Sequence, residues 1–331
     1  EIVGIVGESG SGKSITSLTL MGLLSKQAQV TSGKIIVDGE VLREADRSFD
    51  EKLYRRFQGS RMSMIFQEPM TSLNPTKKAG VQVDEIVRLH TDLEKEKRYE
   101  KVLETFQAVG LKDAKKVYDS YPHQLSGGMR QRVMIAMAIA CAPKLLIADE
   151  PTTALDVTIQ AQILELINRL KKERRLSVIF ITHDLGVVAN MADRIAIMYA
   201  GKIVEYGTAD DVFYDPRHPY TWALLSSMPD LETREKLEAI PGTPPDMILP
   251  PKGDAFAARN KYAMEIDFEE QPPMFHVSET HMAATWLLHP NAPKVNPPAI
   301  VTERIERMKK EQAEREAAEA LQNAKKGAAE A

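Results

Sequence analysis

The stretch GESGSGKS, residues 7–14, has the residue types that a protein needs to bind phosphate groups. It matches the pattern G-x-x-x-x-G-K-[ST] in full and lies between the apolar run IVGIV and a helix-like stretch, ITSLTLMGLL. Glycines let backbone N–H groups close around phosphate oxygens, and the start of a helix adds a positive field. Lys13 is expected to reach the β- and γ-phosphates of a nucleotide, and Ser14 to hold Mg²⁺. The predicted contacts from this loop are Gly7, Glu8, Ser9, Gly10, Ser11, Gly12, Lys13, Ser14 and Ile15.

A pair of carboxylates follows a second apolar run. The stretch KLLIAD, residues 144–149, reads as a buried strand that ends at Asp149, with Glu150 directly after it. A carboxylate at the end of such a strand can bind magnesium beside a phosphate loop. A second carboxylate next to it is placed to polarise an attacking water. We therefore expect Asp149 to be a metal ligand and Glu150 to be a general base.

The stretch LSGGMRQR, residues 125–132, reads as a second helix start suited to phosphate. Ser126 can cap the helix, and Gly127 and Gly128 allow close approach. One chain already has a phosphate loop, so a second one is redundant within it. The stretch is useful if it completes the site of another subunit.

Six segments follow one another in an informative order. They are GESGSGKS, MIFQEP with Gln67, LSGGMRQR, LLIAD followed by Glu150, ALD at 154–156, and FITHD with His183. In type and order they resemble the Walker A loop, Q-loop, signature, Walker B strand, D-loop and switch histidine of ABC transporter ATP-binding subunits. The resemblance is strong over about 1–230 and reaches to about 293. Met129 stands where the signature commonly has Gln, which leaves Ser126 and Gly128 untouched.

The resemblance implies a role for each matching residue. Glu150 is the general base, His183 contacts the γ-phosphate, and Gln67 contacts Mg²⁺ and reports to a transmembrane partner. Asp156, in the D-loop, communicates across a dimer of ATPase domains. ATP and Mg²⁺ are the implied cofactors, with Ser14, Gln67 and Asp149 as the metal ligands. The implied signature residues, which serve the partner's site, are Ser126, Gly127, Gly128 and Gln131.

Three further segments resemble the oligopeptide and dipeptide permeases, in the D-type of their two ATPase subunits. They are FQEPMTSLNP at 66–75, ALDVTIQAQIL at 154–164 and HPYTWALLSSMP at 218–229. This implies a peripheral protein on the cytoplasmic face of the cell membrane. Its partners would be a similar but distinct ATPase chain, two transmembrane permease subunits and, indirectly, an extracellular substrate-binding protein.

The alternation of apolar strands and helical stretches predicts an α/β fold with a parallel sheet. The resemblance implies a P-loop NTPase (RecA-like) ABC ATPase core with a helical subdomain and an irregular C-terminal extension. The predicted parts are a core at 1–80 and 142–210 without its N-terminal strands, a helical subdomain at 81–141 containing the signature, an extension at 211–300, and a charged helical tail at 301–331. The adenine-stacking aromatic of the family belongs to the missing strands and is not assigned.

Composition excludes several classes of protein. The net charge of −4, from 43 Lys and Arg against 47 Asp and Glu, does not favour a nucleic-acid partner. The single cysteine, Cys141, cannot form an internal disulfide or a cysteine-ligated cluster, and it suits a reducing cytosol. No apolar run approaches the roughly 20 residues that a membrane span needs.

The stretch KGDAFAARNKYAMEID, residues 252–267, resembles the C-terminal region of peptide-importer ATPases. There, G-C-x-F-A-x-R-C-x-x-A-x-x-x-C and a later H-x-x-A-C provide four cysteines for an iron–sulfur cluster. Here those positions read Asp254, Asn260, Asp267 and Thr285. Such clusters need thiolates, so we expect no iron–sulfur cluster.

Two readings of this C-terminal region stay open. One is a hard-metal site, built from Asp254, Asp267, His276 and His281. The other, which we favour, is a packed cap held by Phe256, Tyr262, Met264 and Trp286.

Other functions compete with peptide import. Nickel and other small-solute importers share much of the pattern. A DNA-repair type ABC ATPase would carry long coiled coils, whereas residues 81–120 are a short helical insert. A P-loop kinase or GTPase lacks the LSGG element, and a GTPase needs an N-K-x-D segment, which is missing here. A metal-binding regulator built on the tail is the remaining alternative.

Overall fold

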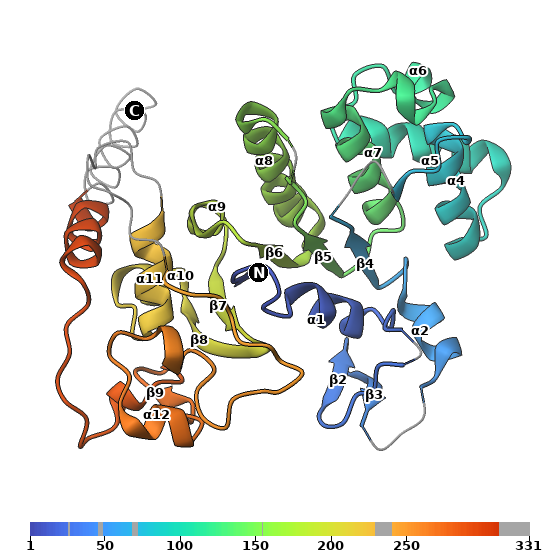
Figure 1. Cartoon of the computed structure of the whole chain (residues 1–331). Coiled ribbons are helices and arrows are strands. Elements are labelled where there is room, and N and C mark those ends of the chain that lie inside the picture. Colours follow the sequence, from blue (N-terminus) through green and yellow to red (C-terminus); the bar gives the residue numbers. More distant parts are fainter. Residues whose placement is uncertain (26, 46–48, 68–71, 154, 229–239, 311–331) are drawn as a thin grey trace, which may run out of the picture. The chain divides into compact units, whose positions relative to one another are not determined.

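The computed structural model describes residues 1–25, 27–45, 49–67, 72–153, 155–228 and 240–310 (Figure 1). The chain divides into two compact units, each described by itself below. The first contains Glu1–Ile5, Gly12–His183 and Met191–Asp193, and the second contains Val6–Ser11, Asp184–Asn190 and Arg194–Ala331. This division follows compactness and does not test the predicted domain bounds, which stay a prediction.

A parallel sheet forms the base of the first unit. Its strand order is β4-β5-β6-β1, and β4 pairs with β5 and β5 with β6 in parallel register. Its strands are short and mostly buried because neighbouring elements cover both faces, as is usual for parallel strands. The elements are β1 (Ile2–Val6), α1 (Lys13–Leu20), β4 (Met62–Ile65), β5 (Leu145–Asp149), α8 (Val157–Arg174) and β6 (Ser177–Thr182).

A hairpin and a short helix pack beside this sheet. The hairpin consists of β2 (Lys34–Val37) and β3 (Glu40–Glu44), which pair antiparallel. Its turn residues Asp38 and Gly39 both have positive φ, 53° and 80°, as a two-residue hairpin turn requires. The helix α2 (Glu51–Phe57) buries Tyr54 and Phe57 in a core with Met21, Leu42, Met62, Ile147 and Ile181.

Four helices form the region that carries the signature. In Figure 1, α4, α5 and α6 gather beside α7. Their buried residues recur at helical spacing, for example Val102 and Phe106 on α5, which confirms the short helical insert expected over 81–120. The elements are α4 (Ala79–His90), α5 (Lys95–Ala108), α6 (Ala114–Asp119), η1 (Pro122–Gln124) and α7 (Gly127–Ile139).

The second unit is built on antiparallel strands. The strand order is β7-β8-β10-β9, and the turn between β7 and β8 has positive φ at Ala200 and Gly201. The elements are α9 (Leu185–Ala189), β7 (Arg194–Tyr199), β8 (Lys202–Thr208), α10 (Ala209–Tyr214), α11 (Pro219–Ser227), η2 (Ala257–Arg259), α12 (Glu265–Glu269), β9 (Phe275–His276), β10 (Met282–Ala283) and η3 (Trp286–Leu288). No helix within the described ranges is long and apolar enough to cross a membrane.

Two predicted helices differ from the observed ones. The first helix ends at Leu20 rather than continuing through 24, because Gly22 takes a φ of 67° that stops the helix. In the tail, where a charged helix was expected from residue 301, residues 299–310 are helical and one side is packed, with Val301 and Arg304 buried. Residues 311–331 of the predicted tail lie outside the described residues.

The predicted cap also differs from the structure. Of its four proposed residues only Phe256 is fully buried, where its ring packs against Tyr199 and Tyr220. Tyr262 packs instead against Trp222, and Trp286 against Phe275. Phe256, Tyr262 and Trp286 thus each pack against a different aromatic neighbour, although Phe256, Tyr262 and Trp222 line one cavity.

Candidate active site

The phosphate-loop sequence adopts the predicted strand, loop and helix. β1 leads into the loop, whose Ser11 N–H donates to the Glu8 carbonyl at 3.2 Å. Gly10 and Gly12 have φ of 80° and 99°, which side-chain-bearing residues rarely adopt. α1 then begins at Lys13, with Gly12 as its N-cap. The first helical turn therefore leaves backbone N–H groups available at the loop.

Asp149 lies beside the start of α1. Its Oδ1 accepts a hydrogen bond from Ser14 Oγ at 3.3 Å, and its Oδ2 accepts one from Ser17 Oγ at 3.2 Å. Burial raises the pKa of Asp149, and the two serine hydrogen bonds oppose that rise. Carboxylate and hydroxyl oxygens side by side are the donors that Mg²⁺ prefers, so Ser14 and Asp149 fit the predicted metal. Ser17 was not predicted, although it lies one turn after Ser14 on the same helix face.

The Glu150 carboxylate contacts residues that follow two neighbouring strands. Gln67 Nε2 donates to Glu150 Oε2 at 3.1 Å, and His183 Nδ1 lies 3.2 Å from the same oxygen. These residues follow β4, β5 and β6, whose carboxyl ends meet at one edge of a parallel sheet. Thr153, which the sequence did not single out, donates to the same oxygen at 3.0 Å.

Glu150 has an unusual backbone conformation. Its φ is 47°, in the left-handed region that residues with a side chain rarely adopt. The Glu150 N–H nevertheless donates to the Ile181 carbonyl at 2.9 Å, so the conformation is anchored to β6. The structure thus brings Gln67, Asp149, Glu150 and His183 together, and their individual roles stay predictions.

The signature residues form the first turn of α7. Ser126 is the N-cap, and its hydroxyl accepts from the Met129 N–H at 3.3 Å, as predicted for a capping serine. A Cβ on Gly128 would come 3.0 Å from Ile159 Cγ2, so this glycine also permits close packing of α8.

Gln131, the fourth of the predicted signature residues, is not on the surface. It is buried, and its Nε2 donates to the Pro151 carbonyl at 2.5 Å. Gln131 therefore ties the signature helix to the turn that follows Glu150.

Asp156 is the exposed N-cap of α8, where it accepts from the Ile159 N–H at 3.0 Å. This local capping bond leaves its predicted role across a dimer a prediction. Ala154, the first residue of the D-loop, lies outside the described residues.

The four positions where the family carries cysteines each cap a backbone N–H. Asp254 accepts from Phe256 at 3.1 Å, Asn260 from Tyr262 at 2.9 Å, Asp267 from Met264 at 2.7 Å, and Thr285 from Leu287 at 3.3 Å. Burial, with the nearby Asp267 charge adding to it, raises the pKa of Asp254 to about 6. Local hydrogen bonding thus explains these polar residues.

The hard-metal alternative is not supported. Within the described ranges, no group of three or more His, Cys, Asp or Glu residues could hold a metal ion. His281 is instead buried with its Nε2 2.8 Å from Glu205 Oε1, and His276 is exposed.

Comparisons with known proteins agree with this geometry. A family model described as ABC transporter matches residues 1–153, and one described as oligopeptide/dipeptide transporter, C-terminal region, matches residues 204–266. The chain is similar to a dimeric ATP-binding cassette in a post-hydrolysis state bound to ADP and Pi. The TM-score is 0.55, with 28% identity over 63% of this chain and 85% of that one.

Curated relatives are more similar still. The oligopeptide transport ATP-binding protein OppD of Bacillus subtilis is 57% identical over 93% of this chain and 86% of its own length. The dipeptide transport ATP-binding protein DppD of Lactococcus lactis is 54% identical over 90% of this chain and 84% of its own length. The chain therefore belongs to the ATP-binding subunits of ABC transporters, ATPases of the P-loop fold, and within them to the oligopeptide and dipeptide transport family.

Proposed function

We propose that this chain hydrolyses ATP to power the import of oligopeptides or dipeptides through a membrane permease. The observation that carries the catalytic part is the convergence of Gln67, Thr153 and His183 on one oxygen of Glu150, directly after Asp149. The match of residues 204–266 to the peptide-transporter C-terminal region supports the substrate class.

The chemistry follows from the positions of these groups. Glu150 takes a proton from the water that attacks the γ-phosphorus while the bond to the ADP oxygen breaks. Its carboxylate is held in place by neutral donors, Thr153 and Gln67, at about 3 Å. His183, whose side chain is 60% exposed, is free to turn from Glu150 towards the γ-phosphate. Lys13, which is buried at the start of α1, supplies positive charge to the phosphates.

Mg²⁺ would be held by Ser14 and Asp149, with Gln67 as the further ligand that the family resemblance implies. When bound, it would neutralise charge on the β- and γ-phosphate oxygens. The side chains of Ser14 and Ser17 keep the Asp149 carboxylate oriented for this purpose.

The working unit that we propose is a pair of ATPase chains with nucleotide between them. Ser126, Gly127 and Gly128 of one chain would face the Walker A loop of the other, which is a similar but distinct subunit. The pair would bind two permease subunits at the cytoplasmic face of the membrane, and a substrate-binding protein would deliver the peptide. The segment around Gln67 and Leu73 would contact the permease. Residues 68–71 of that segment lie outside the described residues.

The test is Ser126→Arg in the assembled transporter. An arginine at the helix start should block hydrolysis at the site that uses the partner's Walker A loop. ATP binding to this chain's own loop should stay unchanged. Photolabelling with an ATP analogue reports binding to each chain, and phosphate release reports hydrolysis.

The matched control is Ser177→Arg, because Ser177 is exposed at the opposite end of β6 from His183. Full hydrolysis by the Ser126→Arg transporter would argue against the shared site. Uptake of labelled peptide into proteoliposomes tests the substrate, and uptake of nickel without peptide uptake would reject the peptide assignment.

A further inference from the structure

Arg259, in the C-terminal region, binds a residue of the Walker A loop. Its Nη1 donates to Glu8 Oε2 at 2.7 Å, and its Nη2 donates to Glu8 Oε1 at 3.1 Å. This is a two-pronged contact between a guanidinium and a carboxylate, the strongest geometry for such a pair. The Arg259 side chain is 6% exposed, so water screens the contact little.

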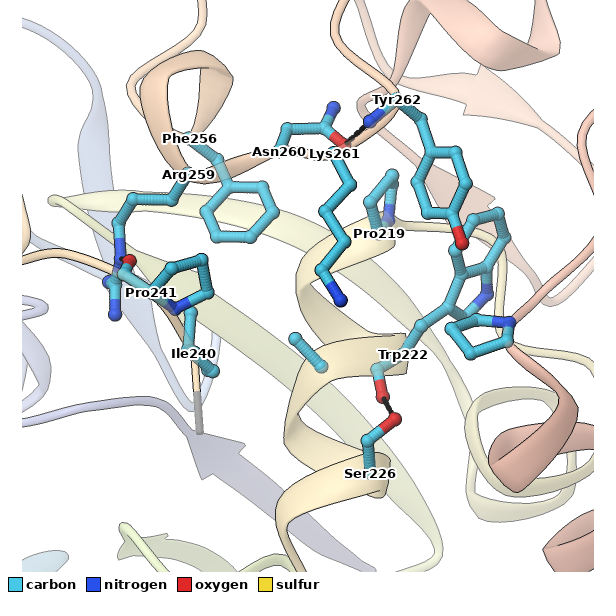
Figure 2. Close-up of a pocket in the computed structure, with 12 residues that line it drawn as sticks. Pro219, Trp222, Ser226, Ile240, Pro241, Phe256, Arg259, Asn260, Lys261 and Tyr262 are labelled. Carbon is cyan, nitrogen blue, oxygen red and sulfur yellow. Dashed lines mark hydrogen bonds between the residues drawn. The ribbon is translucent and has the colours of Figure 1, made fainter. Parts of the chain in front are cut away.

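The remaining donors of Arg259 are also fixed. Its Nε donates to the Pro241 carbonyl at 2.8 Å, and Nη1 also donates to the Tyr199 hydroxyl at 3.1 Å. In Figure 2 the side chain runs past Phe256 to Pro241, along the wall of a cavity. That cavity is only about 50 Å³, which is room for a water or two rather than for a ligand. Its hydrogen bonds to Pro241 and Tyr199 therefore hold the Arg259 guanidinium beside Glu8.

The backbone of the same loop segment is held as well. The Glu8 N–H donates to the Tyr220 hydroxyl at 2.9 Å. The Ser11 carbonyl accepts from the Gly201 N–H at 2.8 Å. A Cβ on Gly7 would collide with the Met198 carbonyl, so the chain passes close to β7 there. Residues from β7, the turn after it, α11 and η2 thus surround the first half of the loop.

We propose that Arg259 is a positioning residue for ATP binding, which sets the conformation and the charge of the Walker A loop through Glu8. This rests on the proposed function, in which the loop holds the phosphates of ATP. A glycine-rich loop has many conformations, and fixing one of them in advance lowers the entropic cost of binding. The Arg259 charge also offsets the Glu8 carboxylate, which would otherwise repel the phosphates. The C-terminal region thereby takes part in nucleotide binding without contributing a residue that contacts ATP.

The experiment is a double-mutant cycle on ATP affinity in the full chain. Arg259→Met and Glu8→Gln are made singly and together, and the Kd for ATP and the Tm are measured for each. We expect Arg259→Met to weaken ATP binding about 10- to 100-fold. The double variant should be weakened much less than the product of the two single effects, because both act through one contact. Arg259→Lys, which keeps the charge but loses the fork, should recover part of the affinity.

The matched control is Arg304→Met. Arg304 is similarly buried, but it donates to carbonyls at the C-terminal end of α11, those of Leu225 and of the capping residue Met228, the latter at 2.8 Å. It should lower the Tm without weakening ATP binding.

Two results would overturn the proposal. One is an Arg259→Met protein that loses Tm as Arg304→Met does but binds ATP normally. The other is a double variant whose loss of ATP affinity equals the product of the losses in the two single variants. If Arg259→Met does not fold, Arg259→Lys decides between the same outcomes. Lys13→Ala tests the underlying assumption separately, because normal ATP binding by that variant would reject the loop as the phosphate site whatever Arg259 does.

Discussion

Glu150 and Glu8 are both held by side chains from distant parts of the sequence, but the donors differ in kind. Glu150 receives hydrogen bonds from the amide of Gln67 and the hydroxyl of Thr153, beside the imidazole of His183. Glu8 accepts two hydrogen bonds from the permanently charged guanidinium of Arg259. A carboxylate that must take up a proton needs partners that do not fix its charge. A carboxylate that holds a loop in place benefits from a partner that does.

The largest expected effect breaks the first of these two arrangements. Glu150→Gln keeps the shape of the side chain but removes the proposed base. ATP turnover by the assembled transporter should fall about 10²- to 10⁴-fold, while ATP still binds. Phosphate release and nucleotide binding are measured on the same preparation.

Glu165→Gln is the control for this change, since Glu165 is an exposed residue of α8. It should leave turnover unchanged. Turnover near the wild-type rate in the Glu150→Gln protein would show that the base is elsewhere.

Asp254 sharpens the comparison, because it is a buried carboxyl group whose pKa is raised by burial. Desolvation raises its pKa from 3.8 to about 6. The folded protein therefore binds this proton more tightly than the unfolded one, and stability falls as the pH rises from about 4 to about 6. Asp254→Asn keeps the cap on Phe256 and removes this penalty. We expect it to raise the free energy of unfolding by about 1–3 kcal/mol at pH 7.5, and by progressively less as the pH is lowered below 6.

Asp246→Asn is matched to this variant, since Asp246 accepts from the Ile248 N–H in a similar turn but is exposed. Its Tm should not change. A stability gain for Asp254→Asn that is the same at pH 7.5 and pH 4 would exclude the ionisation as its cause.

The smallest effect tests how firmly the base is held. Thr153→Val removes one hydrogen bond to Glu150 Oε2 but keeps the side-chain shape. Turnover should fall about 2- to 10-fold, and Thr153→Ser should restore it. Steady-state kinetics should place the loss in kcat rather than KM. A Thr153→Val protein with full kcat would mean that Gln67 and the local backbone suffice to orient Glu150.

The local parts of the fold and the site were predictable from sequence. Asp38 and Gly39 specify their turn through φ values that few other residues adopt. The apolar stretches that end at Asp149 and His183 predict buried parallel strands. Because parallel strands place their carboxyl ends at one edge of the sheet, these two residues were expected to lie close together. The proximity of Gln67, Glu150 and His183 was therefore predictable in outline, whereas the contact from Thr153 was not.

The parts that were missed join residues far apart in sequence. Arg259 and Glu8 are 251 positions apart, and neither has a neighbour that signals the other. The pair formed by Glu205 and His281 is hidden for the same reason. The neighbours of the cap residues were not predictable, because aromatic residues close in sequence, such as Phe256 and Tyr262, can pack against different rings. Hydrophobicity alone does not tell which contact each one joins.

The two residues of β10 have a consequence for the solubility of shortened forms of the chain. Met282 and Ala283 pair with Tyr206 and Glu205 of β8, and β10 in turn pairs with the two-residue β9. Very short outer strands leave few free backbone groups for another molecule to pair with. A chain cut before residue 275 would lack β9 and β10, so this edge of β8 would be exposed. The buried Glu205 would also lose its partner His281. Such fragments should self-associate through β8, so limited proteolysis in this region would turn a working subunit into an aggregating one.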